Sequence, residues 1–247
     1  MIKHIWVLTL FPEYFAPFME CGISGSAFSG ERSDGDFKFE MHFVNIRDFS
    51  STKYKSVDDS PYGGGPGMVM RADILRDALM KGVVETGGYE STDELHVIYT
   101  SPRGTVWNNK VAREFGVAIL SNPVKDLVFI CGRYEGVDER FLQKYVNEYY
   151  SVGDFVLTGG EIAVMLMLDS SVRFVPGILG NKLSSEHDSF EDGLIEFPQY
   201  TKPREFEGLE VPSVLLEGHH KKIEEWQLEE KIRMTRAYRP DLLARKP

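Results

Sequence analysis

The stretch LVFICGRYEGVDERFLQKYVNEYYSVGDFVLTGGEIAVMLML, residues 127–168, alternates strand and helix patterns and so decides the fold. Leu127 to Cys131 is a short apolar run typical of a buried strand, and Asp138 to Tyr145 has helical spacing. Tyr149 to Leu157 is predicted to be extended, and an apolar helix is predicted from Glu161 to Leu168. This alternation predicts an α/β domain with a mostly parallel sheet covered on both faces.

The same alternation extends back to the N-terminus. The further predicted elements are strands at Ile2 to Leu10, Phe37 to Val44 and His96 to Tyr99, and helices at Ala72 to Val83 and Asn109 to Leu120. In the second strand, Phe37, Phe39, Met41 and Phe43 alternate with other residues, so they share one face. Gly82 is expected to end the helix that contains it.

The pattern changes in the last third of the chain. Asn181 to Asp192 is polar and has no periodicity, so we predict a mobile interdomain linker over residues 179–195. A first domain then spans residues 1–178 and a smaller domain residues 196–247. The clearest element of the smaller domain is a helix from Gly218 to Tyr238.

Composition narrows the class of protein. The 247 residues include 42% hydrophobic side chains, which excludes a disordered chain. The net charge of −10 argues against binding nucleic acid through bulk charge, so any such partner must be met locally. Residues 231–246 contain six basic side chains and one acidic side chain, Asp241. The basic side chains form either a surface for a polyanion or a complement to a helix dipole.

Metal, disulfide and membrane signals are weak. Cys21 and Cys131 are the only cysteines, and no Cys/His cluster has zinc-ligand spacing, so we expect neither a disulfide scaffold nor a metal site. The N-terminus has the pattern of a strand without a cleavage site, and no apolar run is long enough to span a bilayer. We therefore expect a cytoplasmic protein that does not bind membranes.

Glycine gathers in four segments near predicted strands: Tyr62–Gly67, Ser101–Gly104, Gly132–Gly136 and Gly153–Gly160. Ligands of open α/β sheets bind beyond the carboxyl ends of the strands, where glycine lets the backbone approach closely. Any one segment could be a simple turn, but their clustering favours a small-molecule site. The sequence has no P-loop, dinucleotide fingerprint, GxSxG elbow or HExxH helix, which argues against the corresponding nucleotide-binding and hydrolase classes.

Five segments in order carry a resemblance to a known family: YGGGPGM (62–68), CGRYEGVDER (131–140), VGDFVLTGGE (152–161), RFVPG (173–177) and YTKP (200–203). They resemble the bacterial tRNA (guanine-N1)-methyltransferases, and the likeness covers residues 1 to about 243. It implies a SPOUT-type parallel sheet domain with a trefoil knot, followed by a smaller C-terminal helical domain. It also implies a homodimer that transfers a methyl group from S-adenosylmethionine to N1 of guanosine 37 in tRNA, next to the anticodon, and does not act on DNA.

Position by position, the resemblance implies a cofactor site made of Pro102, Gly104, Gly132, Glu135, Val152, Gly153, Asp154, Phe155, Val156, Leu157, Gly159 and Gly160. Val152, Phe155 and Leu157 would give adenine an apolar slot. Glu135 would hold a hydroxyl or the ammonium of the donor, unless it is only an acid favoured by a helix dipole.

Methylation at guanine N1 requires a general base, because the neutral base carries a hydrogen on that nitrogen. The resemblance implies Asp188 as this base and Arg173 as the donor to O6, where negative charge grows. Asp188 could instead be a solvated acid and Arg173 part of a structural ion pair. His187 is the strongest substitute base on intrinsic pKa, and the neighbouring acids Glu186, Glu191 and Asp192 are further alternatives.

The match has departures, at Tyr54, Gln199, Lys202 and Glu196, which affect positions expected to contact RNA or a second subunit. We expect the C-terminal helical domain to hold tRNA through bases such as Lys231, Arg233 and Arg236. A requirement for Mg²⁺ is left open, because no carboxylate cluster has clear metal spacing. Methylation of another RNA base or ribose by the same fold, and a catalytically silent RNA-binding protein, are the alternative functions.

Overall fold

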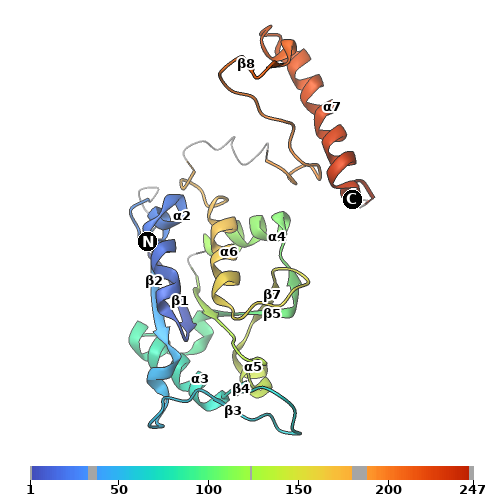
Figure 1. Ribbon diagram of the computed structural model, residues 1–247. Coiled ribbons are helices and arrows are strands. Elements are labelled where there is room, and N and C mark those ends of the chain that lie inside the picture. The colour runs from blue at the N-terminus through green and yellow to red at the C-terminus, as the bar shows by residue number, and fades with distance from the viewer. Residues whose placement is uncertain (1, 33–37, 123, 180–187, 245–247) are drawn as a thin grey trace. The chain divides into compact units, whose positions relative to one another are not determined.

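The computed structural model of the chain describes residues 2–32, 38–122, 124–179 and 188–244. Two compact units follow one another along the chain, Met1–Gly180 and Asn181–Pro247 (Figure 1). Across these described ranges, no helix has the length and apolar character needed to cross a membrane.

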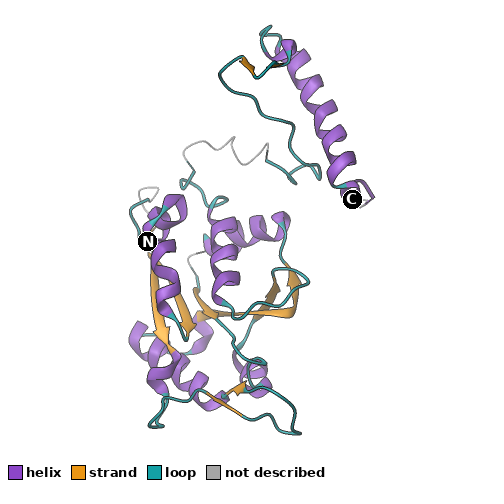
Figure 2. Cartoon of the chain, viewed as in Figure 1, coloured by secondary structure: helices purple, strands orange, loops and turns teal. Residues whose placement is uncertain are grey.

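A parallel sheet forms the centre of the first unit (Figures 1 and 2). Its described strands are β1 (Ile2–Thr9), β2 (Lys38–Asn45), β5 (Leu95–Val106), β6 (Asp126–Ile130) and β7 (Glu148–Ser151). Their order in the sheet is β2-β1-β6-β5-β7, and every neighbouring pair runs parallel. The prediction of an α/β fold with a parallel sheet is therefore confirmed.

The four helices predicted in the first unit are present, together with shorter helical segments that were not predicted. They are η1 (Pro12–Phe15), α1 (Ala16–Glu20), α2 (Gly22–Phe28), η2 (Ile46–Phe49), α3 (Ala72–Leu79), η3 (Met80–Glu85), η4 (Thr92–Glu94), α4 (Asn109–Glu114), η5 (Phe115–Leu120), α5 (Glu139–Tyr145) and α6 (Glu161–Val172). Side-chain caps begin several of them; for example, the Asn108 carboxamide oxygen accepts from Val111 N before α4, and the Asp138 carboxylate accepts from Arg140 N before α5. Such caps satisfy backbone donors that a helix start leaves unpaired.

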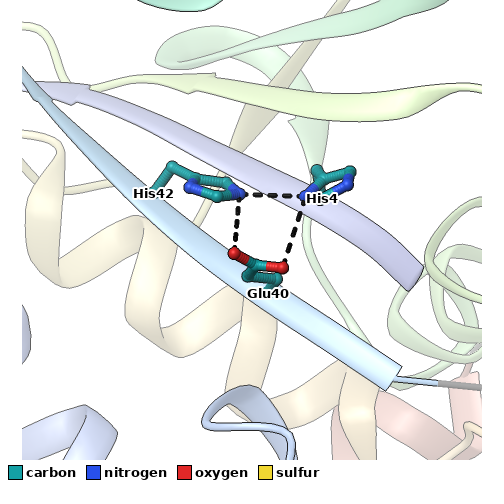
Figure 3. A group of neighbouring side chains, drawn as sticks. All are labelled: His4, Glu40 and His42. Carbon is teal, nitrogen blue, oxygen red and sulfur yellow. Dashed lines mark hydrogen bonds and ion pairs between the residues drawn. The ribbon is translucent and has the colours of Figure 1, made fainter. Parts of the chain in front are cut away.

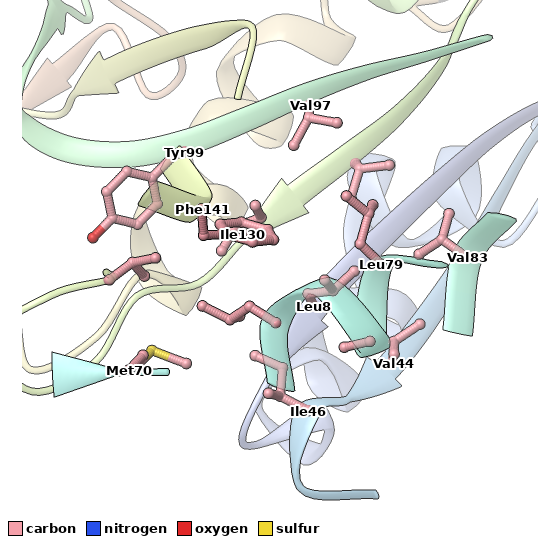
Figure 4. Close-up of a cluster of buried hydrophobic side chains, with 14 of the residues drawn as sticks. Leu8, Val44, Ile46, Met70, Leu79, Val83, Val97, Tyr99, Ile130 and Phe141 are labelled. Atoms are coloured by element: carbon pink, nitrogen blue, oxygen red, sulfur yellow. The ribbon is translucent and has the colours of Figure 1, made fainter. Parts of the chain in front are cut away.

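Two hydrophobic clusters cover the two faces of the sheet, because side chains alternate along the central strand β1. Trp6 and Leu8 lie in the first cluster, with residues of α3 and α5 (Figure 4). Ile5 and Val7 lie in the second, with residues of α2, η5 and α6. Burying each large aliphatic side chain contributes about 1.5–3 kcal/mol, so covering both faces fixes this strand at the centre.

Several boundaries differ from the sequence predictions: β5 runs on to Val106 and α6 to Val172, and two further differences involve glycine. Helical structure does not end at Gly82 but continues as η3. Glycine is needed here for packing: a Cβ would lie 2.7 Å from Val44 Cγ1 in β2 and 2.8 Å from Phe49 Cζ. The extended run predicted to Leu157 ends as a strand at Ser151, since Gly153 has a φ of 145° that turns the chain out of the sheet.

A small antiparallel pair, β3 (Asp58–Asp59) with β4 (Val69–Met70), completes the first unit. The second unit contains β8 (Glu205–Phe206), β9 (Leu209–Glu210), η7 (Ser213–Leu215), α7 (His220–Tyr238) and α8 (Pro240–Ala244). The helix predicted from Gly218 to Tyr238 is confirmed as α7. Phe37 and residues 180–187 of the predicted linker lie outside the described residues.

Candidate functional site

Three neighbouring parallel strands, β6, β5 and β7, contribute to one cavity. The loops that follow β6 and β7 lie beside the irregular part of β5, where the register with β7 shifts between Thr100 and Thr105. These segments enclose about 270 Å³, close to the lower end of the roughly 300–1,000 Å³ typical of small-molecule sites. The lining residues come from 99–102, 132–136, 150–153 and 155–160, together with Ala163.

Most of the cofactor-site residues predicted from the sequence line this cavity. Those that do are Pro102, Gly132, Glu135, Val152, Gly153, Phe155, Val156, Leu157, Gly159 and Gly160. Gly104 and Asp154 are not part of the lining. Asp154 is exposed in the loop after β7. Gly104 lies against the backbone of Tyr149 and Tyr150, where a Cβ would collide, so its role in this structure is to let β5 pass close to β7.

The glycines of the lining are required by packing as well as by turns. A Cβ on Gly160 would lie 2.7 Å from Thr100 Oγ1 and 2.8 Å from Cys131 Cα. A Cβ on Gly132 would lie 2.7 Å from the Tyr99 hydroxyl oxygen. Any side chain at these two positions would therefore displace the strand ends that shape the cavity.

The fourth glycine-rich segment, Tyr62–Gly67, does not line the cavity but supports it from outside. Glu135 N donates to Met68 O at 3.0 Å and Met70 N donates to Gly136 O at 2.9 Å, so the chain after this segment pairs with the loop after β6. The missing side chain of Gly67 leaves room for the Glu135 side chain. The loop that carries Glu135 is thus held from two sides.

A buried ion pair joins the loop after β6 to the start of α6. The Arg133 guanidinium donates to Glu161 Oε2 at 2.9 Å and to Thr158 O at 3.1 Å, and Glu161 is only 1% exposed. The Thr9 hydroxyl donates to Glu161 Oε1 at 2.7 Å, which ties in the end of β1. Arg133 and Glu161 lie within two of the five family segments, but neither was predicted to be a site residue. Their opposite charges, within two glycine-rich segments, were the signal in the sequence that could have identified the pair.

The cavity offers polar groups to a ligand. Thr100 Oγ1 is buried at the lining and has no hydrogen-bond partner among the described residues, so a bound molecule can satisfy it. Tyr134 has a φ of 58°, an uncommon conformation for a residue with a side chain, and such strain gathers at functional sites. Neither residue was selected from the sequence, because burial and backbone conformation are properties of the folded chain.

Burial sets the protonation of two groups around the cavity. It raises the pKa of the Tyr99 hydroxyl, with the nearby Arg103 partly opposing the shift, so this group remains a hydrogen-bond donor at neutral pH. Burial also raises the pKa of the Cys131 thiol, and the Glu161 carboxylate adds to the shift. Cys131 is therefore a protonated core residue rather than a nucleophile.

The two predicted catalytic residues belong to different units. Arg173 is exposed at the C-terminal end of α6 in the first unit. Asp188 begins the described part of the second unit, in a turn where Ser189 Oγ accepts from Glu196 N at 2.9 Å and Phe190 N donates to Leu194 O at 2.7 Å. His187 and Glu186 lie outside the described residues.

This turn is anchored on α7, although a mobile linker was expected there. Lys231 Nζ donates to Asp192 Oδ2 at 2.5 Å, and Thr235 Oγ1 accepts from Ile195 N at 3.0 Å. Lys231 is only 9% exposed, so the prediction that it contacts tRNA is corrected: the ion pair with Asp192 turns it inward. Arg236 is exposed on the same helix.

Comparison with known proteins agrees with the motifs. Residues 3–245 match the family described as tRNA (Guanine-1)-methyltransferase TrmD. A Clostridioides difficile protein is 44% identical over 96% of this chain and 95% of its own length. A Lactobacillus delbrueckii subsp. bulgaricus protein is 45% identical (98% of this chain, 90% of its own) and a Shewanella piezotolerans protein 46% identical (96% and 89%).

All three relatives carry the name tRNA (guanine-N(1)-)-methyltransferase. The family match spans nearly the whole chain, including the strand-end loops that form the cavity and α7 of the second unit. The chain therefore belongs to the tRNA (Guanine-1)-methyltransferase TrmD family.

Proposed function

We propose that this protein transfers a methyl group from S-adenosylmethionine to N1 of guanosine 37 in tRNA. The observation that carries the proposal is the cavity formed by the irregular part of β5 and the loops after β6 and β7, which is lined by segments that match the family. Membership of the family supplies the reaction, and the cavity supplies a place for the donor.

The cavity suits a donor with an aromatic base and a charged amino-acid end. Val152, Phe155 and Leu157 offer apolar surface to the base, and the neighbouring glycines expose backbone groups for hydrogen bonds. Glu135 is the one acid among the described lining residues, and it would hold a hydroxyl or an ammonium group. When bound, S-adenosylmethionine supplies an electrophilic methyl group on a sulfonium.

We keep all the predicted residues in the proposed cofactor site, including the two that do not line the cavity. Gly104 lets β5 approach β7, and Asp154 belongs to the loop after Gly153. A requirement for Mg²⁺ is not part of the proposal.

Proton removal is assigned to Asp188, and charge stabilisation to Arg173. As N1 loses its proton, negative charge develops on O6, which a guanidinium stabilises through a charge-assisted hydrogen bond. Because Asp188 belongs to the second unit, tRNA that binds this unit would also orient the Asp188 carboxylate. Proton removal would then occur only when the correct substrate is bound.

The finer architecture is also part of the proposal. We infer a trefoil-knotted first domain (1–178), a linker (179–195), a C-terminal helical domain (196–247) that holds tRNA, and a homodimer in the cytoplasm. The parallel order β2-β1-β6-β5-β7 and the helical second unit support this assignment. With Lys231 engaged by Asp192, exposed bases of α7 such as Arg233 and Arg236 are the RNA contacts we propose.

Nucleoside analysis tests the reaction. Purified protein is incubated with S-adenosylmethionine and an unmodified tRNA transcript bearing guanosine at position 37, and the digested RNA is analysed by mass spectrometry. N1-methylguanosine is expected with this transcript and not with one carrying adenosine at that position. Methylation of a different base or of a ribose would refute the assignment.

A further inference from the structure

Two histidines and a glutamate meet on the sheet. Among the described residues, His4, Glu40 and His42 form a cluster whose candidate ligand atoms all lie within 4.8 Å of one another (Figure 3). His4 comes from β1, and Glu40 and His42 come from β2. His4 lies more than 35 positions before the other two, which is why no metal-ligand spacing is visible in the sequence.

Parallel register creates the cluster. His4 is the direct partner of Glu40, and Trp6 is the partner of His42. Because side chains alternate along a strand, positions two apart point to the same face, so all three groups lie on one face of the sheet. They lie toward the N-terminal ends of the parallel strands, whereas the cavity lies at the carboxyl ends. The cluster is therefore not part of the proposed cofactor site.

Distances within the cluster are close to those of a metal site. His4 Nδ1 is 2.9 Å from His42 Nε2 and 3.9 Å from Glu40 Oε2, and His42 Nε2 is 3.8 Å from Glu40 Oε1. In a tetrahedral zinc site with bonds of about 2.0 Å, ligand atoms are about 3.3 Å apart. The three distances bracket this value, so side-chain movements of a few tenths of an ångström would form the site.

Surrounding groups hold the ligands in place. The Trp6 ring stacks on His42 at 4.1 Å between centroids with an interplanar angle of 21°, and this fixes the imidazole orientation. Asp126 Oδ1 accepts from His4 N at 2.9 Å, and its other oxygen accepts from the Tyr89 hydroxyl at 2.6 Å. The bond from the backbone N of His4 fixes the chain at this residue, and the stacking fixes the ring of His42.

Both imidazoles can offer a lone pair to the ion. The short Nδ1 to Nε2 contact needs one hydrogen between the two rings, and a neutral imidazole can carry that hydrogen on its other nitrogen instead. A cation between the rings would replace a single shared hydrogen with three bonds.

We propose that His4 Nδ1, His42 Nε2 and the Glu40 carboxylate bind one divalent transition-metal ion of the zinc type. Two imidazoles and one carboxylate are ligands that Zn²⁺ prefers, and three protein ligands leave a fourth position for water. Glu40 is about half exposed, with a side-chain accessibility of 53%, so the ion can reach the site from solvent. A bound ion would fasten the edge strand β2 to β1.

Titration of the full chain with Zn²⁺ tests the site. The protein is first stripped with a chelator, and His219 and His220 are changed to glutamine to remove a second histidine pair from the background. Isothermal titration is expected to give one equivalent of bound Zn²⁺. Co²⁺ as a spectroscopic probe is expected to show the visible bands of a four-coordinate ion.

Variants of the cluster are compared with a matched control. Loss of an outer partner typically costs about 10- to 100-fold in metal affinity, so Glu40→Gln and His42→Gln should each weaken Zn²⁺ binding at least that much. His96→Gln breaks a different histidine–carboxylate pair, 3.4 Å from Glu148, and should leave the affinity unchanged.

Stability separates loss of binding from misfolding. Glu40→Gln conserves shape at a half-exposed position, so its thermal midpoint without metal should match that of the parent. Excess Zn²⁺ should raise the midpoint of the parent but not that of the variant, because only a bound ion stabilises the folded state. The proposal would be overturned if the parent bound no stoichiometric Zn²⁺. It would also be overturned if Glu40→Gln and His42→Gln bound Zn²⁺ as tightly as the parent.

Discussion

We propose Asp188 as the proton acceptor of the reaction. It precedes a turn held by Ser189 and anchored to α7 through Asp192. We expect Asp188→Asn to lower methyl transfer by about 10²- to 10⁴-fold, the usual contribution of a general base. Single-turnover kinetics with tRNA and calorimetric titration with the donor measure the two properties; donor affinity should not change, since the cavity residues belong to the first unit.

Glu191→Gln is the matched control, because it removes an acid three residues away in the same turn. Its turnover should remain within about twofold of the parent if proton removal belongs to Asp188 alone, since a general base contributes far more than that. Equal losses in the two variants would move the role to the turn as a whole. A pH–rate profile that is unchanged in Asp188→Asn would place the base elsewhere.

Lys3 shows how a charged residue is accommodated in the core. The side chain is 1% exposed, and its ammonium donates to Asn122 O at 2.6 Å and to Lys125 O. These carbonyls follow the C-terminal end of η5, where a cation is favoured by the helix dipole. Burial nevertheless lowers the pKa of Lys3 from 10.5 to about 8, with the Asp126 carboxylate partly opposing the shift.

This shift predicts a pH dependence of stability. Below pH 8 both the folded and the unfolded chain are protonated at Lys3, so the cost of burial is fully present. Between about 8 and 10.5 only the unfolded chain keeps the proton, so the free energy of unfolding should rise with pH by at most about 1.4 kcal/mol per unit. Urea denaturation of the native protein and of Lys3→Met from pH 7 to about 9.5 isolates the effect; a constant difference between them would contradict it.

The connection between the β6 loop and α6 depends on the ion pair of Arg133 with Glu161. Their charged groups lie 2.9 Å apart, and Arg133 also stacks over the Phe11 ring at 4.5 Å. Buried pairs add little net stability over an apolar pair, but removing one partner leaves an uncompensated charge. The pair therefore specifies where the loop and the helix meet more than it strengthens the fold.

We expect Arg133→Met to lower the free energy of unfolding by about 3–5 kcal/mol, and the double variant Arg133→Met/Glu161→Leu to recover most of this loss. Arg140→Met is the control: its ion pair with Asp138 is exposed, so the cost should not exceed about 1 kcal/mol. Urea denaturation gives all three values. A double variant as unstable as Arg133→Met would mean that the pair itself, rather than the orphaned charge, provides the stability.

The chain as a whole folds as two compact units, and we propose that the donor binds the first and tRNA the second. Protection by each ligand should report this division. S-adenosylmethionine is expected to slow amide hydrogen exchange in the cavity loops, residues 99–102, 132–136 and 152–160, and to leave α7 unchanged. Addition of tRNA should extend protection to α7 and to residues 188–196. Hydrogen-exchange mass spectrometry measures both, and donor-induced protection of α7 without RNA would contradict the division.

Much of the fold could be predicted from local pattern. The apolar runs of β1 and β6 and the helical spacing of α5 and α6 appear in the sequence, because burial imposes a period on each element. Element ends were harder to predict. Gly82 lies inside a helix, where a side chain would collide with Val44. Gly153 follows a strand, and its positive φ turns the chain out of the sheet. The sequence alone does not distinguish these two uses of glycine.

The sequence by itself determined the α/β class, the family motifs and ten of the cavity residues, since these depend on periodicity and on segments read in order. Only the tertiary structure decided that Lys231 is paired with Asp192, that Thr100 lacks a partner among described residues, and that His4 meets Glu40 and His42. The physical reason is that strand register and helix docking bring distant residues together, and no local pattern records such contacts.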